Sequence, residues 1–200
     1  MSVFKPSLPY DEKVSALLDT ILNEERTAKC LEEIRTYDQY TYWHCVRVAI
    51  LSLRLGLIRN YSNNELMLLG ASALLHDYGK LMVPLEILNK PSRLTDEEYS
   101  IVKLHVLNGV TMLAELGFPK EILRTISEHH EGMKDGYPFG LEINEISRMG
   151  RIVRISDFYD ALVVKRVYHK EYTIEEVMDI LTENETVDMS LVKLIRSMAI

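Results

Sequence analysis

Five of the six histidines and two aspartates have the side chains and sequence neighbours expected of a metal site. These residues are His44, His76, Asp77, His105, His129, His130 and Asp157. Both aspartates lie in apolar stretches, ALLHDYGKLMVP and RIVRISDFYDAL, where an unpaired carboxylate is costly to bury. A lone histidine on an apolar helix is more often a core residue, but that explanation would have to hold five times here. We therefore predict a site with imidazole and carboxylate ligands for divalent Mn, Fe or Zn.

Seven such side chains supply enough ligands for two metal ions if one carboxylate bridges them. Two cations about 3.5–4 Å apart can activate a water molecule and hold the oxygens of a phosphodiester. Lys80 comes four residues after His76, so on a continuing helix it would project from the same face and could contact the phosphate or the leaving oxygen. The alternative for Lys80 is a solvated lysine favoured by the helix dipole.

Helices are expected to position these residues, because almost every apolar stretch has helical rather than alternating periodicity. Capping boxes, in which Ser or Thr is followed three residues later by Glu, predict helix starts at Ser62, Thr95 and Thr173. The predicted helices span about residues 11–34, 38–57, 62–77, 95–117, 119–130, 143–168, 173 onward and 189–198, with an irregular segment over 131–141. The sequence therefore predicts an all-α fold, a single helical bundle.

The composition indicates a soluble globular protein, with 47% hydrophobic and 26% charged residues. Its net charge of −7 argues against general affinity for nucleic acid or an anionic membrane, since both require a basic surface. The most apolar stretch, 66–75, is too short for the roughly 20 residues of a membrane span, and the first residues, MSVFKPSLPYDEK, lack the apolar core expected of a signal peptide. We expect a cytoplasmic protein whose two cysteines, Cys30 and Cys45, are reduced and buried.

The order of the motifs resembles the HD superfamily, whose pattern of His, His-Asp and a distant Asp is matched by His44, His76-Asp77 and Asp157. It is more similar still to the HD-GYP branch. The matching segments are DQYTYWHCVRVA (38–49), HDYGKLMVP (76–84), ILNKPSRLTDEE (87–98), His105, HHE (129–131), GYP (136–138), SDFYDAL (156–162) and VDMSLVKLI (187–195). We accordingly divide the chain into an N-terminal helical extension, 1–35, and an HD-GYP phosphodiesterase domain, 36–200.

This resemblance implies a bundle of the HD-domain type that hydrolyses cyclic di-GMP to linear pGpG and/or GMP. By matching position, one metal ion would be held by His44, His76, Asp77 and Asp157. Asp77 would bridge to a second ion, held by His105, His129 and His130. The expected cofactors are two divalent ions, Fe or Mn above all.

The resemblance also implies residues that handle the substrate, a cyclic dinucleotide. Lys80 and Asp77 would take part in catalysis, with Lys80 at the phosphate. Tyr137 would belong to a substrate lid, and Arg166 would contact the ligand.

Two features depart from the pattern of the branch. Some members hold a third metal ion with a glutamate one turn before the first histidine, and that position is Tyr40 here, so we expect two metals. The loop after the paired histidines usually reads HHE-x-x-D-G-x-G-Y-P, but this chain has the shorter HHEGMKDGYP, with Asp135 as the candidate loop aspartate. The shorter loop bears on substrate handling more than on metal binding.

Several roles stay open at this point. Arg47 is either part of a structural ion pair or a substrate contact. The aromatic residues Tyr40, Tyr42 and Trp43 are expected in the core rather than as a platform for stacking guanine. The segment 1–35 could pack on the bundle or mediate dimerisation, so a homodimer is possible.

Two other functions compete with cyclic di-GMP hydrolysis. An HD phosphohydrolase acting on another nucleotide is favoured if the shorter loop no longer accommodates two guanines. A signalling module would bind metal and nucleotide but work through a partner, such as a diguanylate cyclase or a receiver protein. The intact ligand set disfavours the module, because a pure adaptor does not need seven metal ligands.

Overall fold

The computed structural model describes residues 11–132, 136–164, 172–184 and 187–198. Its helices are α1 (Asp11–Leu22), α2 (Glu25–Tyr37), α3 (Gln39–Ile58), α4 (Asn63–Leu75), the 3-10 helix η1 (Tyr78–Met82), α5 (Leu85–Leu88), α6 (Asp96–Lys103), α7 (His105–Glu115), α8 (Lys120–Glu128), α9 (Arg148–Val163), α10 (Ile174–Glu183) and α11 (Met189–Met198). Within these described ranges there is no strand, and the predicted all-α bundle is confirmed.

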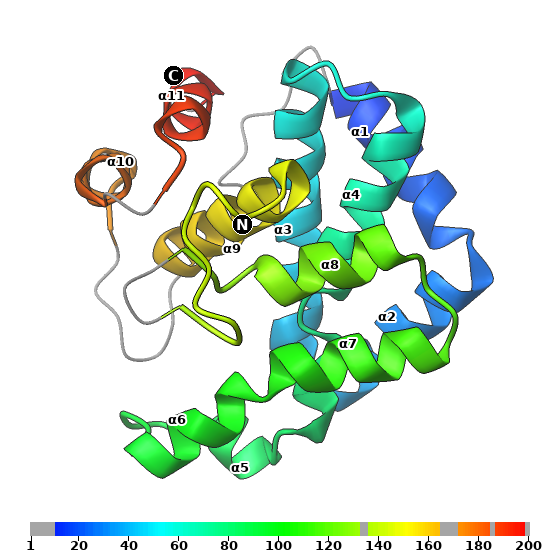
Figure 1. Cartoon of the computed structure of the whole chain (residues 1–200), viewed down its shortest axis with the longest axis vertical. Coiled ribbons are helices and arrows are strands. Elements are labelled where there is room, and N and C mark those ends of the chain that lie inside the picture. Colours follow the sequence, from blue (N-terminus) through cyan, green and yellow to red (C-terminus); the bar gives the residue numbers. More distant parts are fainter. Residues whose placement is uncertain (1–10, 133–135, 165–171, 185–186, 199–200) are drawn as a thin grey trace.

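Helix α3 is the centre of the bundle (Figure 1). It packs along α4, is crossed by α9, and also contacts α2. Most of its residues after His44 are buried, as the density of apolar residues in this segment predicts. Helices α7 and α8 lie side by side, with α8 packed on α4 and α7 packed on η1.

Residues 11–37 form two helices rather than the single helix expected over 11–34. The chain turns after Leu22, and Glu24 caps α2 by accepting a hydrogen bond from the Thr27 backbone N–H at 2.7 Å. Apolar residues of both helices, among them Ile21 and Ile34, join the same core as α3 and α4. This segment therefore packs on the bundle, while the domain division at residue 35 stays a prediction.

Other helix boundaries also differ from those expected, and they differ near the candidate ligands. The helix expected over 62–77 ends at Leu75, and the one expected over 95–117 is broken at Leu104. The irregular segment expected to end at 141 continues to Ser147, which caps α9 by accepting a hydrogen bond from the Gly150 N–H. Helix α9 ends at Val163 instead of reaching residue 168.

Gly79 allows the backbone of η1 to contact the backbone of α7 directly. A Cβ added at Gly79 would lie 1.9 Å from the carbonyl oxygen of His105 and 2.4 Å from the backbone nitrogen of Gly109. No side chain fits in that space, because both neighbours are backbone atoms. The approach brings the turn that carries Asp77 and Lys80 next to the helix that begins at His105.

Local features predicted from the sequence are largely present. The capping boxes at Ser62, Thr95 and Thr173 all form, with both hydrogen bonds in each. Cys30 and Cys45 are buried and unpaired. Among the helices of the described ranges, none combines the length and the apolar character that crossing a membrane requires.

Candidate metal centre

All seven candidate ligands converge in the structure, although they come from five different parts of the fold. His44 lies on α3 and Asp157 on α9, whereas the others lie at helix ends. His76 is the C-cap of α4 and is followed by Asp77 at the start of η1. His105 begins α7, and His129 and His130 follow α8.

The ligand atoms form two clusters. In the first cluster, the ligand atoms of His44, His76 and Asp77 all lie within 4.8 Å of one another. The second cluster, which meets the same limit, consists of His105, His129 and His130. Each cluster therefore offers a divalent metal ion three ligands at plausible spacing.

The carboxylate of Asp77 lies between the two clusters. Its Oδ2 is 3.5 Å from Nε2 of His44 and 3.4 Å from Nε2 of His76. Its other oxygen, Oδ1, is 3.3 Å from Nε2 of His105. One oxygen thus faces each cluster, which is the arrangement that a bridging carboxylate requires.

Asp157 adds a carboxylate to the first cluster, and the ring of His130 packs against the other two rings of the second. Oδ1 of Asp157 lies 3.1 Å from Nε2 of His44 and 4.0 Å from Nε2 of His76, so Asp157 belongs with the first cluster. The ring of His130 lies 4.1 Å from that of His129 and 5.2 Å from that of His105 between centroids. The structure therefore brings together every residue that the sequence singled out as a metal ligand.

Hydrogen bonds orient four of the imidazoles so that Nε2 points into the site. Nδ1 bonds the carbonyl oxygen three residues earlier in His76 (to Ala73, 2.9 Å), His105 (to Val102, 2.7 Å) and His129 (to Ile126, 2.5 Å). With Nδ1 as the donor, the Nε2 lone pair remains available to a metal ion. The same four Nε2 atoms approach one another in pairs, at 3.3 Å between His44 and His76 and 3.2 Å between His105 and His129. Such close contacts between ring nitrogens fit a cation shared by each pair.

Asp160 orients the fourth ring, and the sequence reasoning gave it no role. Nδ1 of His44 is 2.7 Å from Oδ2 of Asp160. Arg47 donates two hydrogen bonds to the same carboxylate, from Nε to Oδ1 at 2.7 Å and from Nη2 to Oδ2 at 3.0 Å. Arg47 therefore forms the structural ion pair that was one of its two expected roles. The signal was in the motif SDFYDAL, because Asp160 lies three residues after Asp157 and one turn further along the same helix face.

Burial and charge keep three of the imidazoles and Asp77 in the states that bind metal, whereas the pKa of His76, which burial alone would lower, is raised by the neighbouring Asp77. Burial lowers the pKa of His105 to about 3, that of His130 to about 4 and that of His129 well below its usual range, so these imidazoles are neutral. Burial alone would raise the pKa of Asp77, but Lys80 and His76 hold it well below the usual value. Asp77 is therefore ionised although its side chain is only 1% exposed.

Lys80 reaches the site by a different route from the one expected. The helix does not continue past His76, since the chain forms the 3-10 turn of η1 instead. The side chain of Lys80 is nevertheless only 18% exposed, and its Nζ lies 2.5 Å from Oδ2 of Asp77. The alternative of a solvated surface lysine is wrong.

Glu131 fastens the loop that carries Tyr137, a role that the sequence reasoning did not assign. Its fully buried carboxylate accepts hydrogen bonds from the backbone N–H groups of Phe139 at 2.5 Å and Leu141 at 2.7 Å. The ring of Tyr137 stacks on the ring of His130, with centroids 4.7 Å apart and planes 26° apart. Tyr137 therefore lies directly against the second cluster.

Most of the remaining residues named from the sequence either lie outside the described residues or differ from their expected burial. Arg166 and Asp135 lie outside the described residues. Tyr40 and Trp43 were expected in the core, but they are 40% and 55% exposed; only Tyr42 packs against the core. Trp43 follows the helical period of α3 to the outer face, which the density of neighbouring apolar residues obscured.

Comparison with known proteins identifies the family. A family model described as "HD domain" matches residues 22–191. A cyclic di-GMP phosphodiesterase of Pseudomonas aeruginosa is 34% identical over 172 residues, covering 85% of this chain and 42% of the relative. A 3'3'-cGAMP-specific phosphodiesterase of Vibrio cholerae is 36% identical over 146 residues, covering 72% of this chain and 32% of the relative. The chain thus spans less than half the length of these curated relatives.

A solved structure shares the fold. An HDG"Y"P protein from Bdellovibrio bacteriovorus superposes with a TM-score of 0.65 at 19% identity, over 92% of this chain and 61% of that one. The match to the family model extends over most of the chain and includes every candidate metal ligand. The chain belongs to the HD-domain family.

Proposed function

We propose that this chain is a metal-dependent phosphodiesterase that hydrolyses cyclic di-GMP to linear pGpG and/or GMP. The observation that carries the proposal is the position of Asp77, with one carboxylate oxygen toward each cluster of imidazoles. HD-domain phosphohydrolases are metal-dependent, and the donor set fits two divalent ions, Fe or Mn, because it contains imidazole and carboxylate but no thiolate. Two relatives act, by their names, on cyclic dinucleotides.

In this proposal the protein divides the work among three groups of residues. When bound, the metal ions would supply an activated water and positive charge at the scissile phosphate. His44, Asp160 and Arg47 form a chain of contacts that holds the first cluster rigid. Lys80 offers a further positive charge at the edge of the site, for the phosphate or the leaving oxygen. Tyr137 offers its ring and hydroxyl to a large substrate beside His130.

Product analysis tests the proposed reaction. Metal-loaded protein is expected to convert cyclic di-GMP to pGpG and/or GMP, as followed by chromatography, and a chelator should abolish this conversion. The same assay with 3'3'-cGAMP serves as the comparison, because one relative is named for that substrate. Turnover of another nucleotide without turnover of cyclic di-GMP would favour the general nucleotide phosphohydrolase.

The site is predicted to hold two metal ions, because Tyr40 is not a carboxylate where a third metal would need one. Elemental analysis of protein purified without chelator should approach two metals per chain. Asp77→Ala should lose both ions, since both clusters share its carboxylate, whereas His105→Ala should retain the first. The matched control is Asp179→Ala, an exposed acid on α10. Equal losses in the first two variants would refute the bridging role.

Lys80 is predicted to act in the reaction rather than in metal retention. Replacing it by Met keeps much of the packing of its stem and removes the charge. Metal content should stay near that of the wild type, while turnover should fall about 10²–10⁴-fold. Lys90→Met removes a lysine that pairs with Glu98 and should change neither quantity. Loss of metal in Lys80→Met would show instead that the lysine only stabilises Asp77.

Tyr137 is predicted to position the large substrate and to take no part in bond cleavage. Tyr137→Ala should lower turnover of cyclic di-GMP at least about tenfold while hydrolysis of bis(p-nitrophenyl) phosphate stays nearly intact. Tyr137→Phe retains the stack on His130 and separates the ring from the hydroxyl. A parallel fall of both activities would make Tyr137 structural, and no fall in either would exclude a lid.

A further inference from the structure

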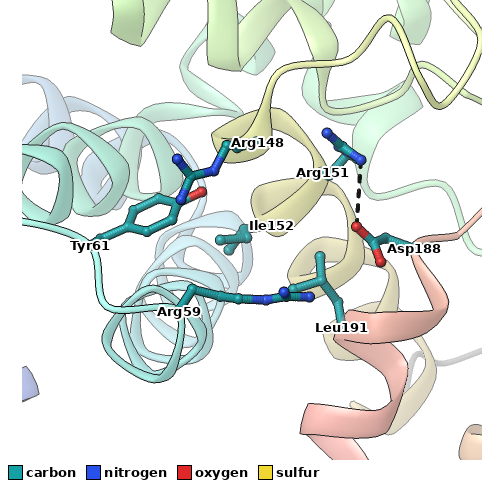
Figure 2. A pocket seen from close by; sticks show the side chains of 7 residues that line it. All are labelled: Arg59, Tyr61, Arg148, Arg151, Ile152, Asp188 and Leu191. Carbon is teal, nitrogen blue, oxygen red and sulfur yellow. Dashed lines mark ion pairs between the residues drawn. The ribbon is translucent and has the colours of Figure 1, made fainter.

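Figure 2 shows a pocket lined by arginines. It lies at the C-terminal end of α3, whereas His44 of the metal centre lies near the N-terminal end of that helix. Its volume is about 270 Å³, and the residues that shape it include Arg59, Tyr61, Arg148, Arg151, Ile152 and Asp188. Arg59 caps α3 and comes 15 residues after His44. At a rise of 1.5 Å per residue, the pocket is about 22 Å from the first cluster along the helix. It is therefore a separate site.

The three arginines come from different directions and leave the pocket positively charged. Figure 2 shows Arg148 over the ring of Tyr61 on one side, Arg151 beside Asp188 on the other, and Arg59 along a third edge. The guanidinium of Arg148 lies 4.7 Å from the centroid of the Tyr61 ring. Asp188 is the one carboxylate among the residues that line the pocket, so three positive charges face a single negative charge. This excess stands out in a chain whose net charge is −7.

Asp188 pairs only loosely with Arg151. Nη1 of Arg151 is 3.6 Å from Oδ2 of Asp188, which is longer than the roughly 2.7–2.9 Å of a close charge-assisted hydrogen bond. Nε of Arg151 is buried and has no hydrogen-bond partner among the described residues. The side chain of Arg151 is nevertheless 29% exposed, so its guanidinium can contact a further acceptor.

A purely structural role explains only part of this arrangement. Arg59 donates to the hydroxyl of Ser190, and Arg151 pairs with Asp188, so both tie the start of α11 to the bundle. That role does not account for the open volume beside the three guanidinium groups. An anion with several acceptor oxygens accounts for it, because guanidinium groups match the geometry of phosphate.

We propose that this pocket binds the dianionic phosphate of a small ligand, either free phosphate or a phosphate monoester such as a nucleoside monophosphate. Arg59, Arg148 and Arg151 hold its oxygens, and the volume admits a phosphate with a small part of its ester group. The walls belong to α3, α9 and the start of α11, so the bound anion ties α11 to the bundle. The proposal does not depend on the reaction at the metal centre.

Isothermal titration calorimetry of the metal-loaded chain tests the proposal, with inorganic phosphate, GMP and guanosine as probes. Arg148→Gln and Arg151→Gln should each weaken binding of phosphate and GMP at least tenfold, and guanosine should not bind to the pocket. Every variant retains the metal centre, so a difference between variants reports the pocket alone. Tighter binding of GMP than of phosphate identifies a monoester as the ligand, and equal binding identifies free phosphate. Identical isotherms for the wild type and both variants would overturn the proposal.

Two further variants separate anion binding from a structural role. Arg35→Gln removes an exposed arginine of α2 that pairs with Glu32, and it should leave phosphate binding unchanged. Asp188→Asn removes the competing charge, while its side-chain oxygen can still accept from the Ser190 N–H. Phosphate binding should then become several-fold tighter, with at most a small fall in the thermal unfolding midpoint, because the pair with Arg151 is long and partly exposed. A lower midpoint without tighter binding would mean that the arginines serve only to hold α11.

Discussion

The buried negative charge of Asp77 is the constraint on which the rest of the structure depends. A carboxylate that is 1% exposed must be compensated, and no single neighbour does so. Three imidazoles and the ammonium of Lys80 surround its two oxygens. In a site with bound metal, the cations would take over most of this compensation. The positions of α4, α7 and α8 then follow from the need to bring histidines to this one side chain.

Three of the histidines lie at helix ends and make the same local hydrogen bond, from Nδ1 of the ring to a backbone carbonyl. Carbonyl groups in the last turn of a helix lack partners within the helix. His76, His105 and His129 each satisfy the carbonyl three residues earlier with Nδ1, at the ends of α4, α6 and α8 respectively. The bond fixes the ring and leaves Nε2 toward the centre. The same hydrogen bond thus caps the end of a helix and orients the imidazole toward the metal site.

Because these hydrogen bonds form at helix ends, the ligands could be predicted from the sequence but the exact helix boundaries could not. The fold class and all seven candidate ligands were accessible, because apolar periodicity and the order of His and Asp motifs are properties of the sequence itself. The break at Leu104 was not accessible, since neither Gly nor Pro marks it and the apolar pattern continues across it. The break depends on the ring of His105 and on the approach of the Gly79 backbone, which are tertiary contacts.

The supporting residues were harder to find than the ligands. Asp160 and Glu131 are buried acids whose partners lie far away in sequence or on the backbone of a loop. Their motifs were visible, but only the structure shows that one holds an imidazole and the other holds the segment around Tyr137. Trp43 shows the opposite error, since its exposure depends on which face of α3 the neighbouring helices leave open.

The most direct test of the central claim is anomalous X-ray diffraction from crystals of the metal-loaded protein. The proposed bridging role of Asp77 predicts two anomalous peaks about 3.5–4 Å apart. One peak should contact Oδ2 of Asp77 together with His44 and His76, and the other should contact Oδ1 together with His105. A single peak, or two peaks of which only one contacts Asp77, would contradict the account.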